Sequence, residues 1–177
     1  MRKFKVYQLI ILLLITSCSS DDDSNNNTQN ISEEIIGIWN LSNYSSNSTT
    51  TETGRVVSEN LSSTDYTLEF TNNPKDINLS GTLVVAVEET NNGNTSNFTY
   101  NVNGDFNEGF HIAEWRIENG NLVTRSFEID PDEEGAFDLI TEIIELTNNS
   151  LILRIDNTQY SSENNTQNGI RTLSYER

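Results

Sequence analysis

Cysteine and histidine are almost absent from this chain of 177 residues, which has one of each, Cys18 and His111. A single cysteine cannot form an intramolecular disulfide, so no disulfide framework is predicted. Zinc sites draw on several cysteine or histidine ligands, so zinc is not expected either. A Ser-His-Asp triad would have to use His111, with Asp105 or Glu114 as the acids nearby in sequence. We therefore predict no metal, no cofactor and no enzymatic activity.

Basic residues are also scarce, because 10 lysines and arginines face 27 acidic residues and the formal net charge is −17. Residues 1–17 hold three of the basic residues and no acid, so the chain from residue 18 onward has 7 basic residues, 27 acidic residues and a net charge of −20. Such a field repels phosphate backbones, and the sequence contains no basic stripe, so nucleic-acid binding is excluded.

Long hydrophobic runs are missing apart from one near the amino end, over residues 6–15. A membrane-spanning helix needs about 20 apolar residues, so this run is too short to span a bilayer stably. Arg2, Lys3 and Lys5 precede it, and small residues follow it. A charged start, a short apolar segment and small residues before the cut are typical of a cleavable signal peptide.

The end of this segment, Ile15-Thr16-Ser17-Cys18, resembles the bacterial lipobox. The resemblance implies that residues 1–17 are removed, that the Cys18 thiol carries a diacylglycerol, and that the new amino end is acylated with a chain such as palmitate. Two or more acyl chains anchor a protein firmly, because each buried CH₂ contributes about 0.8 kcal/mol. The alternative is an ordinary signal peptide or an uncleaved anchor.

Residues 18–32 are expected to form a solvated tether, because the stretch from 19 to 30 contains no apolar side chain to bury. Asp21, Asp22 and Asp23 resemble an export signal that sends lipoproteins of some Gram-negative bacteria to the outside of the outer membrane. The alternative is a charged linker that keeps the domain off an anionic surface. We predict an outer-membrane lipoprotein displayed on the cell surface.

Residues 33–177 read as one all-β domain, because short alternating runs are broken by Asn, Gly, Ser and Asp clusters. Strands are predicted over 35–44, 54–60, 66–71, 79–89, 98–103, 110–118, 121–129, 137–147, 151–156 and 169–176. Tight turns in chain order favour an antiparallel up-and-down meander of about 8–10 strands. Closing the meander into a barrel would remove its exposed edges.

The start of this domain resembles the first strand of the lipocalins, with Gly37 and Trp39 matching their Gly-x-Trp motif. The hairpin-like segments at 115–122 and 142–153 are similar to those of lipocalin-like bacterial lipoproteins. The resemblance implies a barrel closed by an arginine of the last strand that stacks on the tryptophan. Arg171 shares a strand face with Leu173 and Tyr175, so we predict that Arg171 stacks on Trp39.

A misread strand register and a ligand role are the alternatives for Arg171. The ligand role is considered because a related family of fatty-acid carriers holds a carboxylate with an arginine and a tyrosine of the final strand. Arg171 and Tyr175 are spaced by four residues rather than two, and Tyr175-Glu176-Arg177 has the compact spacing in reverse order.

Two functions are left open by the sequence. The first is binding of a small hydrophobic or amphipathic ligand inside a monomeric barrel. A barrel filled by its own aromatic residues, Phe70, Phe98, Tyr100 and Phe106, would leave no room for such a ligand. The second is a ligand-free module that presents its acidic outer face to a partner protein or glycan.

One further segment, 130–135, has carboxylates and a glycine in the order of a calcium-binding loop. Position twelve of that loop is Thr141, with Glu142 one residue late, and the flanking segments read as strands. An acidic hairpin turn is therefore predicted in place of a calcium site.

Overall fold

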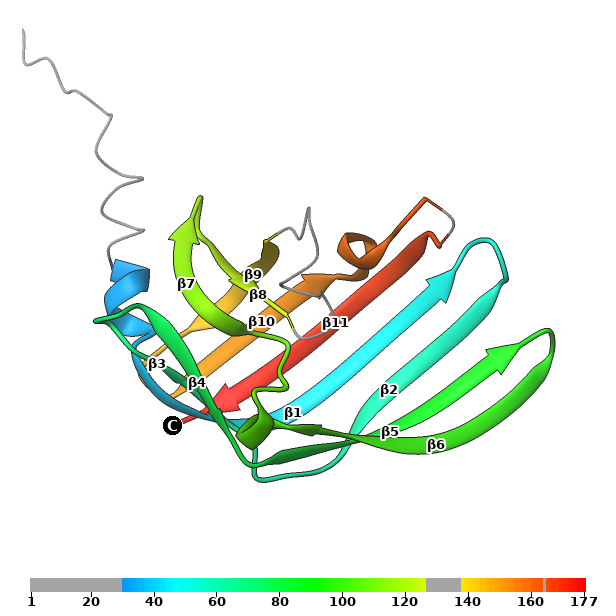
Figure 1. Cartoon of the computed structure of the whole chain (residues 1–177), viewed down its shortest axis with the longest axis horizontal. Coiled ribbons are helices and arrows are strands. Elements are labelled where there is room, and N and C mark those ends of the chain that lie inside the picture. Colours follow the sequence, from blue (N-terminus) through cyan, green and yellow to red (C-terminus); the bar gives the residue numbers. More distant parts are fainter. Residues whose placement is uncertain (1–29, 127–137, 164) are drawn as a thin grey trace, which may run out of the picture.

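The computed structural model describes residues 30–126, 138–163 and 165–177, which form an antiparallel β-structure preceded by one helical turn at 30–34 (Figure 1). Residues 30–32 of this turn were expected to belong to the solvated tether, and they are helical instead. Two short 3₁₀ helices, η1 (Gly104–Phe106) and η2 (Asn157–Tyr160), interrupt the strand succession. The strands are β1 (Gly37–Thr50), β2 (Arg55–Thr64), β3 (Thr67–Phe70), β4 (Asp76–Ser80), β5 (Thr82–Asn91), β6 (Asn94–Asn103), β7 (Ile112–Glu118), β8 (Asn121–Arg125), β9 (Leu139–Leu146), β10 (Ser150–Asp156) and β11 (Gln167–Glu176).

Eight of these strands close into a barrel, because β1 pairs with β3 at its beginning and with β11 along most of its length. Around the barrel the order is β1, β3, β4, β7, β8, β9, β10 and β11. Neighbours are antiparallel throughout, and most are consecutive in sequence. The predicted all-β, lipocalin-like barrel is confirmed.

The three remaining strands, β2, β5 and β6, form a sheet that extends from the barrel and that we call the wing (Figure 1). The wing arises because two long chain segments bend: β2 continues into β3 after two residues, and β4 continues into β5 at Gly81. Gly81 has a φ of +76°, and a Cβ there would lie 2.3 Å from the Asp65 carbonyl oxygen. A single strand over 79–89 was therefore the wrong prediction, since this left-handed, crowded position divides it.

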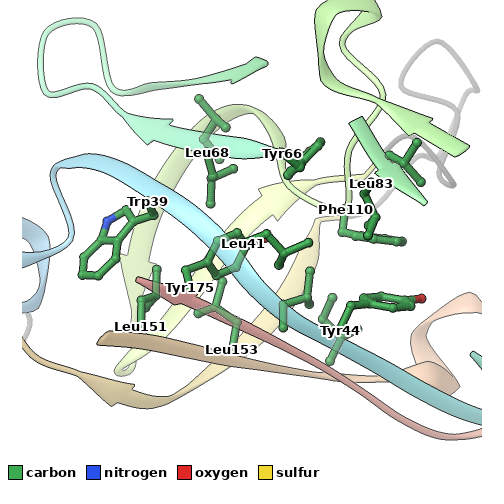
Figure 2. Close-up of a cluster of buried hydrophobic side chains, with 14 of the residues drawn as sticks. Trp39, Leu41, Tyr44, Tyr66, Leu68, Leu83, Phe110, Leu151, Leu153 and Tyr175 are labelled. Atoms are coloured by element: carbon green, nitrogen blue, oxygen red, sulfur yellow. The ribbon is translucent and has the colours of Figure 1, made fainter. Parts of the chain in front are cut away.

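Aliphatic and aromatic side chains form the core and fill the end of the barrel that contains Trp39, Leu151 and Tyr175 (Figure 2). Inward positions alternate with outward ones, as the burial pattern of β10 shows for Leu151, Leu153 and Ile155. Fully buried large side chains include Trp39, Tyr44, Phe70, Phe110, Leu68, Leu83, Leu122, Leu139 and Tyr175.

Of the four aromatic residues whose packing would leave no room for a ligand, Phe70 alone is fully buried inside the barrel. Phe70 is buried, but Phe98 is 47% exposed and Phe106 is 77% exposed. Tyr100 is half-buried, and Val102 alone of the alternating β6 positions is buried. The physical reason is that β6 belongs to the wing, so its far half has few elements packed on it.

Candidate functional site

A buried polar cluster lies where the wing leaves the barrel, and Ser46 of β1 is at its centre. Ser46 is directly opposite Glu59 of β2 on one side and Arg171 of β11 on the other. Directly opposed residues of antiparallel strands share a face, so all three point inward. Because Ser46 is small and 2% exposed, the two long side chains can meet above it.

Glu59 receives hydrogen bonds from two tyrosines. The Tyr44 hydroxyl donates to Glu59 Oε2 at 2.5 Å, and the Tyr100 hydroxyl donates to Glu59 Oε1 at 3.2 Å. Arg171 Nη2 lies 3.7 Å from Glu59 Oε2. Burial is the main cause that raises the pKa of Tyr44, and it outweighs the lowering effect of the Arg171 charge, so the Tyr44 hydroxyl remains a donor.

Arg171 is 6% exposed and lies among aromatic rings. Its guanidinium carbon is 4.5 Å from the ring centroid of Phe110, 5.3 Å from that of Tyr160 and 6.0 Å from that of Tyr44. Nη1 also donates to the Tyr160 hydroxyl of η2 at 3.3 Å. The rings of Tyr44 and Phe110 stack at 5.2 Å, which fixes two walls of the cluster (Figure 2).

His111 is fully buried next to this cluster. Its Nδ1 lies 3.1 Å from Thr124 Oγ1, and that hydroxyl donates to the Arg125 carbonyl oxygen, so Nδ1 is the donor. Nε2 then carries a lone pair, and it has no hydrogen-bond partner in the part of the chain that the structure describes. Burial first, and the positive charge of Arg171 second, lower the pKa of His111 to about 3.

The predicted stacking of Arg171 on Trp39 is wrong, because Arg177 occupies that place. The Arg177 guanidinium carbon lies 3.9 Å from the Trp39 ring centroid, and its Nη2 donates to the carbonyl oxygens of Glu34 and Ile36. The strand register explains the difference, since Asn40 is opposite Glu176 whereas Arg171 is opposite Ser46. At about 3.3 Å per residue, six residues place Arg171 roughly 20 Å farther along the strand.

Tyr175 is buried in the barrel core, opposite Leu41 and Leu151, and burial raises its pKa. It faces inward with Arg171, as predicted, but four residues of β11 separate them by about 13 Å. The structure therefore does not combine the two into one site. Cys18, the acidic triplet at 21–23 and the calcium-like segment at 130–135 lie outside the described residues.

Sequence reasoning missed the other members of this cluster: Tyr44, Glu59, Phe110 and Tyr160, which lie around Arg171, and Tyr100, which donates to Glu59. One signal was available: Glu59 interrupts an alternating face whose other members, Val57 and Leu61, are apolar. A carboxylate at an inward position needs partners, because an unpaired buried charge is costly. No comparable signal marked Tyr160, which reaches the cluster from η2.

The fold and the cluster define a class of protein, a lipocalin-like β-barrel with a charged, aromatic-lined interior. No protein-family model matches the chain, and no curated protein matches it. Among the described residues, no three His, Cys, Asp or Glu side chains gather closely enough to hold a metal ion. Within the same residues, no helix has the length and apolar character needed to cross a membrane.

Proposed function

We propose that this protein is a lipid-anchored lipoprotein of the outer membrane, displayed on the cell surface, whose barrel binds a small amphipathic ligand. The observation that carries the binding role is the Arg171 guanidinium, buried among three aromatic rings inside a lipocalin-like barrel. A buried cation on an apolar wall suits a ligand with an acidic head group and an apolar body.

In this proposal the ligand's acidic group binds Arg171 Nη2 in place of the Glu59 carboxylate. Glu59 is 3.7 Å from Nη2, which is longer than a charge-assisted hydrogen bond of about 2.7–2.9 Å. Tyr44 and Tyr100 donate hydrogen bonds to Oε2 and Oε1 of Glu59, so they would hold this carboxylate when the ligand takes its place beside Arg171. The rings of Phe110 and Tyr160 contact the apolar part of the ligand.

Native mass spectrometry of the protein purified from its own host is the first test, and a co-purifying lipid or acidic amphiphile is the expected result. Arg171→Met should weaken binding of a fluorescent fatty acid such as cis-parinaric acid by roughly 10- to 100-fold, since a hydrogen bond to a charged group contributes about 1.5–3 kcal/mol. Arg154→Met is the matched control, because Arg154 is exposed and pairs with Glu142. Absence of both a co-purifying molecule and saturable binding would contradict the ligand role.

The anchor is tested separately at Cys18. Cys18→Ser should abolish labelling by radioactive palmitate and release the protein from the membrane fraction, because serine offers no thiol for the diacylglycerol. Ser19→Ala is the neighbouring control and should leave both unchanged. Membrane fractionation of Cys18→Ser that equals the wild type would refute the lipoprotein assignment.

A further inference from the structure

The wing ends in a strand with a free edge. In the part of the chain that the structure describes, β6 pairs with β5 on one side and with no strand on the other. Natural edge strands are commonly protected by charged residues, proline, bulges or short length. β6 has ten residues, contains no charge and no proline, and pairs with β5 without a register shift.

This absence of charge is unusual for the molecule. Among the described strands, β1 and β6 alone lack a charged residue, and β1 has neighbours on both sides. In a chain whose domain is strongly acidic, β6 is therefore an uncharged strip of backbone that is open to pairing. The exposed ring of Phe98 lies at its middle.

The turn before β6 determines which backbone groups face outward. Asn92 and Gly93 form a two-residue hairpin turn with φ of 50° and 78°, and Asn91 is paired with Asn94. In such a hairpin the flanking pair is hydrogen-bonded, so every second residue from Asn94 onward bonds to β5. The N–H and C=O groups of the intervening residues point away from β5: Thr95, Asn97, Thr99 and Asn101.

A groove lies beside this edge on the wing face opposite Glu59. It has a volume of about 440 Å³ and is lined by Asn60, Ala86, Val87, Glu88, Asn97, Phe98 and Thr99. Ala86 and Thr99 are directly opposed, as are Glu88 and Asn97. Glu88 is exposed, and no ion pair of Glu88 occurs among the described residues.

We propose that β6 binds an extended segment of another protein by strand addition, and that this segment carries an arginine or lysine. The segment's backbone pairs with the outward groups of β6, and its cationic side chain lies across Thr99 into the groove, near Glu88. This binding surface is separate from the interior site at Arg171.

A second copy of this chain fits the edge less well. The residues that it would place on the groove face, Asn97, Thr99 and Asn101, are short and uncharged, so they leave the groove empty. Each copy also carries the same strong negative charge, which repels another copy and attracts a basic partner. Charge complementarity therefore favours a basic segment.

The test uses four nine-residue peptides of alternating threonine and valine with arginine, lysine, glutamine or glutamate at the centre. The peptides are added in detergent to the protein purified from its host. Two quantities are measured: the dissociation constant of each peptide and the amide hydrogen exchange of residues 94–103. We expect protection of β6, with the arginine and lysine peptides bound about two- to fivefold more tightly than the glutamine peptide, as for an exposed ion pair.

Variants separate the backbone from the charge. Thr99→Pro removes an outward N–H without removing a bond to β5, and it should weaken all peptides at least about tenfold, whereas Thr99→Val keeps the N–H and should bind normally. Glu88→Gln should abolish the preference for arginine and leave the glutamine peptide unaffected. N-methylation of alternate amides in the arginine peptide tests the same hydrogen bonds without altering the protein.

Three results would overturn the proposal. The first is absence of protection of residues 94–103 by all four peptides at millimolar concentration. The second is equal affinity for the arginine and glutamate peptides. The third is a dimer in sedimentation whose β6 amides are protected without peptide, which would assign this edge to a second copy.

Discussion

Replacing Trp39 with alanine should destabilise the domain by about 3–5 kcal/mol. The indole is fully buried, and its Nε1 donates to the Ile35 carbonyl oxygen at 2.8 Å. Truncation would leave a large cavity and an unsatisfied carbonyl group, and it would remove the ring on which Arg177 stacks. A domain of this size typically has a free energy of unfolding of about 5–15 kcal/mol, so the loss would be a large part of it.

Urea unfolding of the full-length protein, followed by circular dichroism, measures this loss. Ile38→Ala is the matched control, because Ile38 is the neighbouring residue and is 55% exposed, and its effect should stay within about 0.5 kcal/mol. A loss below about 1 kcal/mol for Trp39→Ala would show that the indole does not support the barrel end.

Stability should also fall steeply in acid because of His111. Its pKa is about 3 in the folded protein, against 6.5 for an unperturbed histidine. Below pH 6.5 the unfolded chain binds a proton at His111 that the folded protein does not bind. The stability that His111 contributes to the folded state above pH 6.5 is therefore lost as the pH falls toward 3. The slope is about 1.4 kcal/mol per pH unit for one proton, on the order of 5 kcal/mol over the whole interval.

His111→Asn isolates this effect, because the amide can still donate to Thr124 but does not titrate. The free energy of unfolding of both proteins should be measured at several values between pH 3 and pH 7. The carboxylates titrate in both the wild type and His111→Asn. The difference between their curves of unfolding free energy against pH therefore gives the contribution of His111. Parallel curves would mean that the imidazole binds its proton over the same pH range in the folded and unfolded states, contrary to its burial and to the absence of a partner for Nε2 among the described residues.

Much of the barrel could be predicted from the sequence. Alternation of apolar and polar residues located most strands, because a strand that faces a core on one side must alternate. The break at Gly81 was missed, since both flanking segments continue the same alternation and the reason for the bend is the approach of the Asp65 carbonyl. The wing was missed as well, because it exists only where the chain bends at Gly81 between β4 and β5.

The candidate site was predicted only in part. The inward direction of Arg171 followed from its alternation with Leu173 and Tyr175, and all three are buried. Its partners did not follow, because Glu59 meets Arg171 across β1 and is more than a hundred residues away in sequence. Long-range register of this kind depends on how the barrel closes, which no local pattern specifies.

The sequence by itself determined the acidic charge and the all-β alternation, because these depend on residue type and local order. The lipid anchor at Cys18 is a prediction that rests on the same kind of local pattern. The tertiary structure decided that Arg177, rather than Arg171, stacks on Trp39, since strand register sets which arginine reaches the end of the barrel. It also decided that β6 is an edge among the described strands, because barrel closure between β1 and β11 leaves the wing outside.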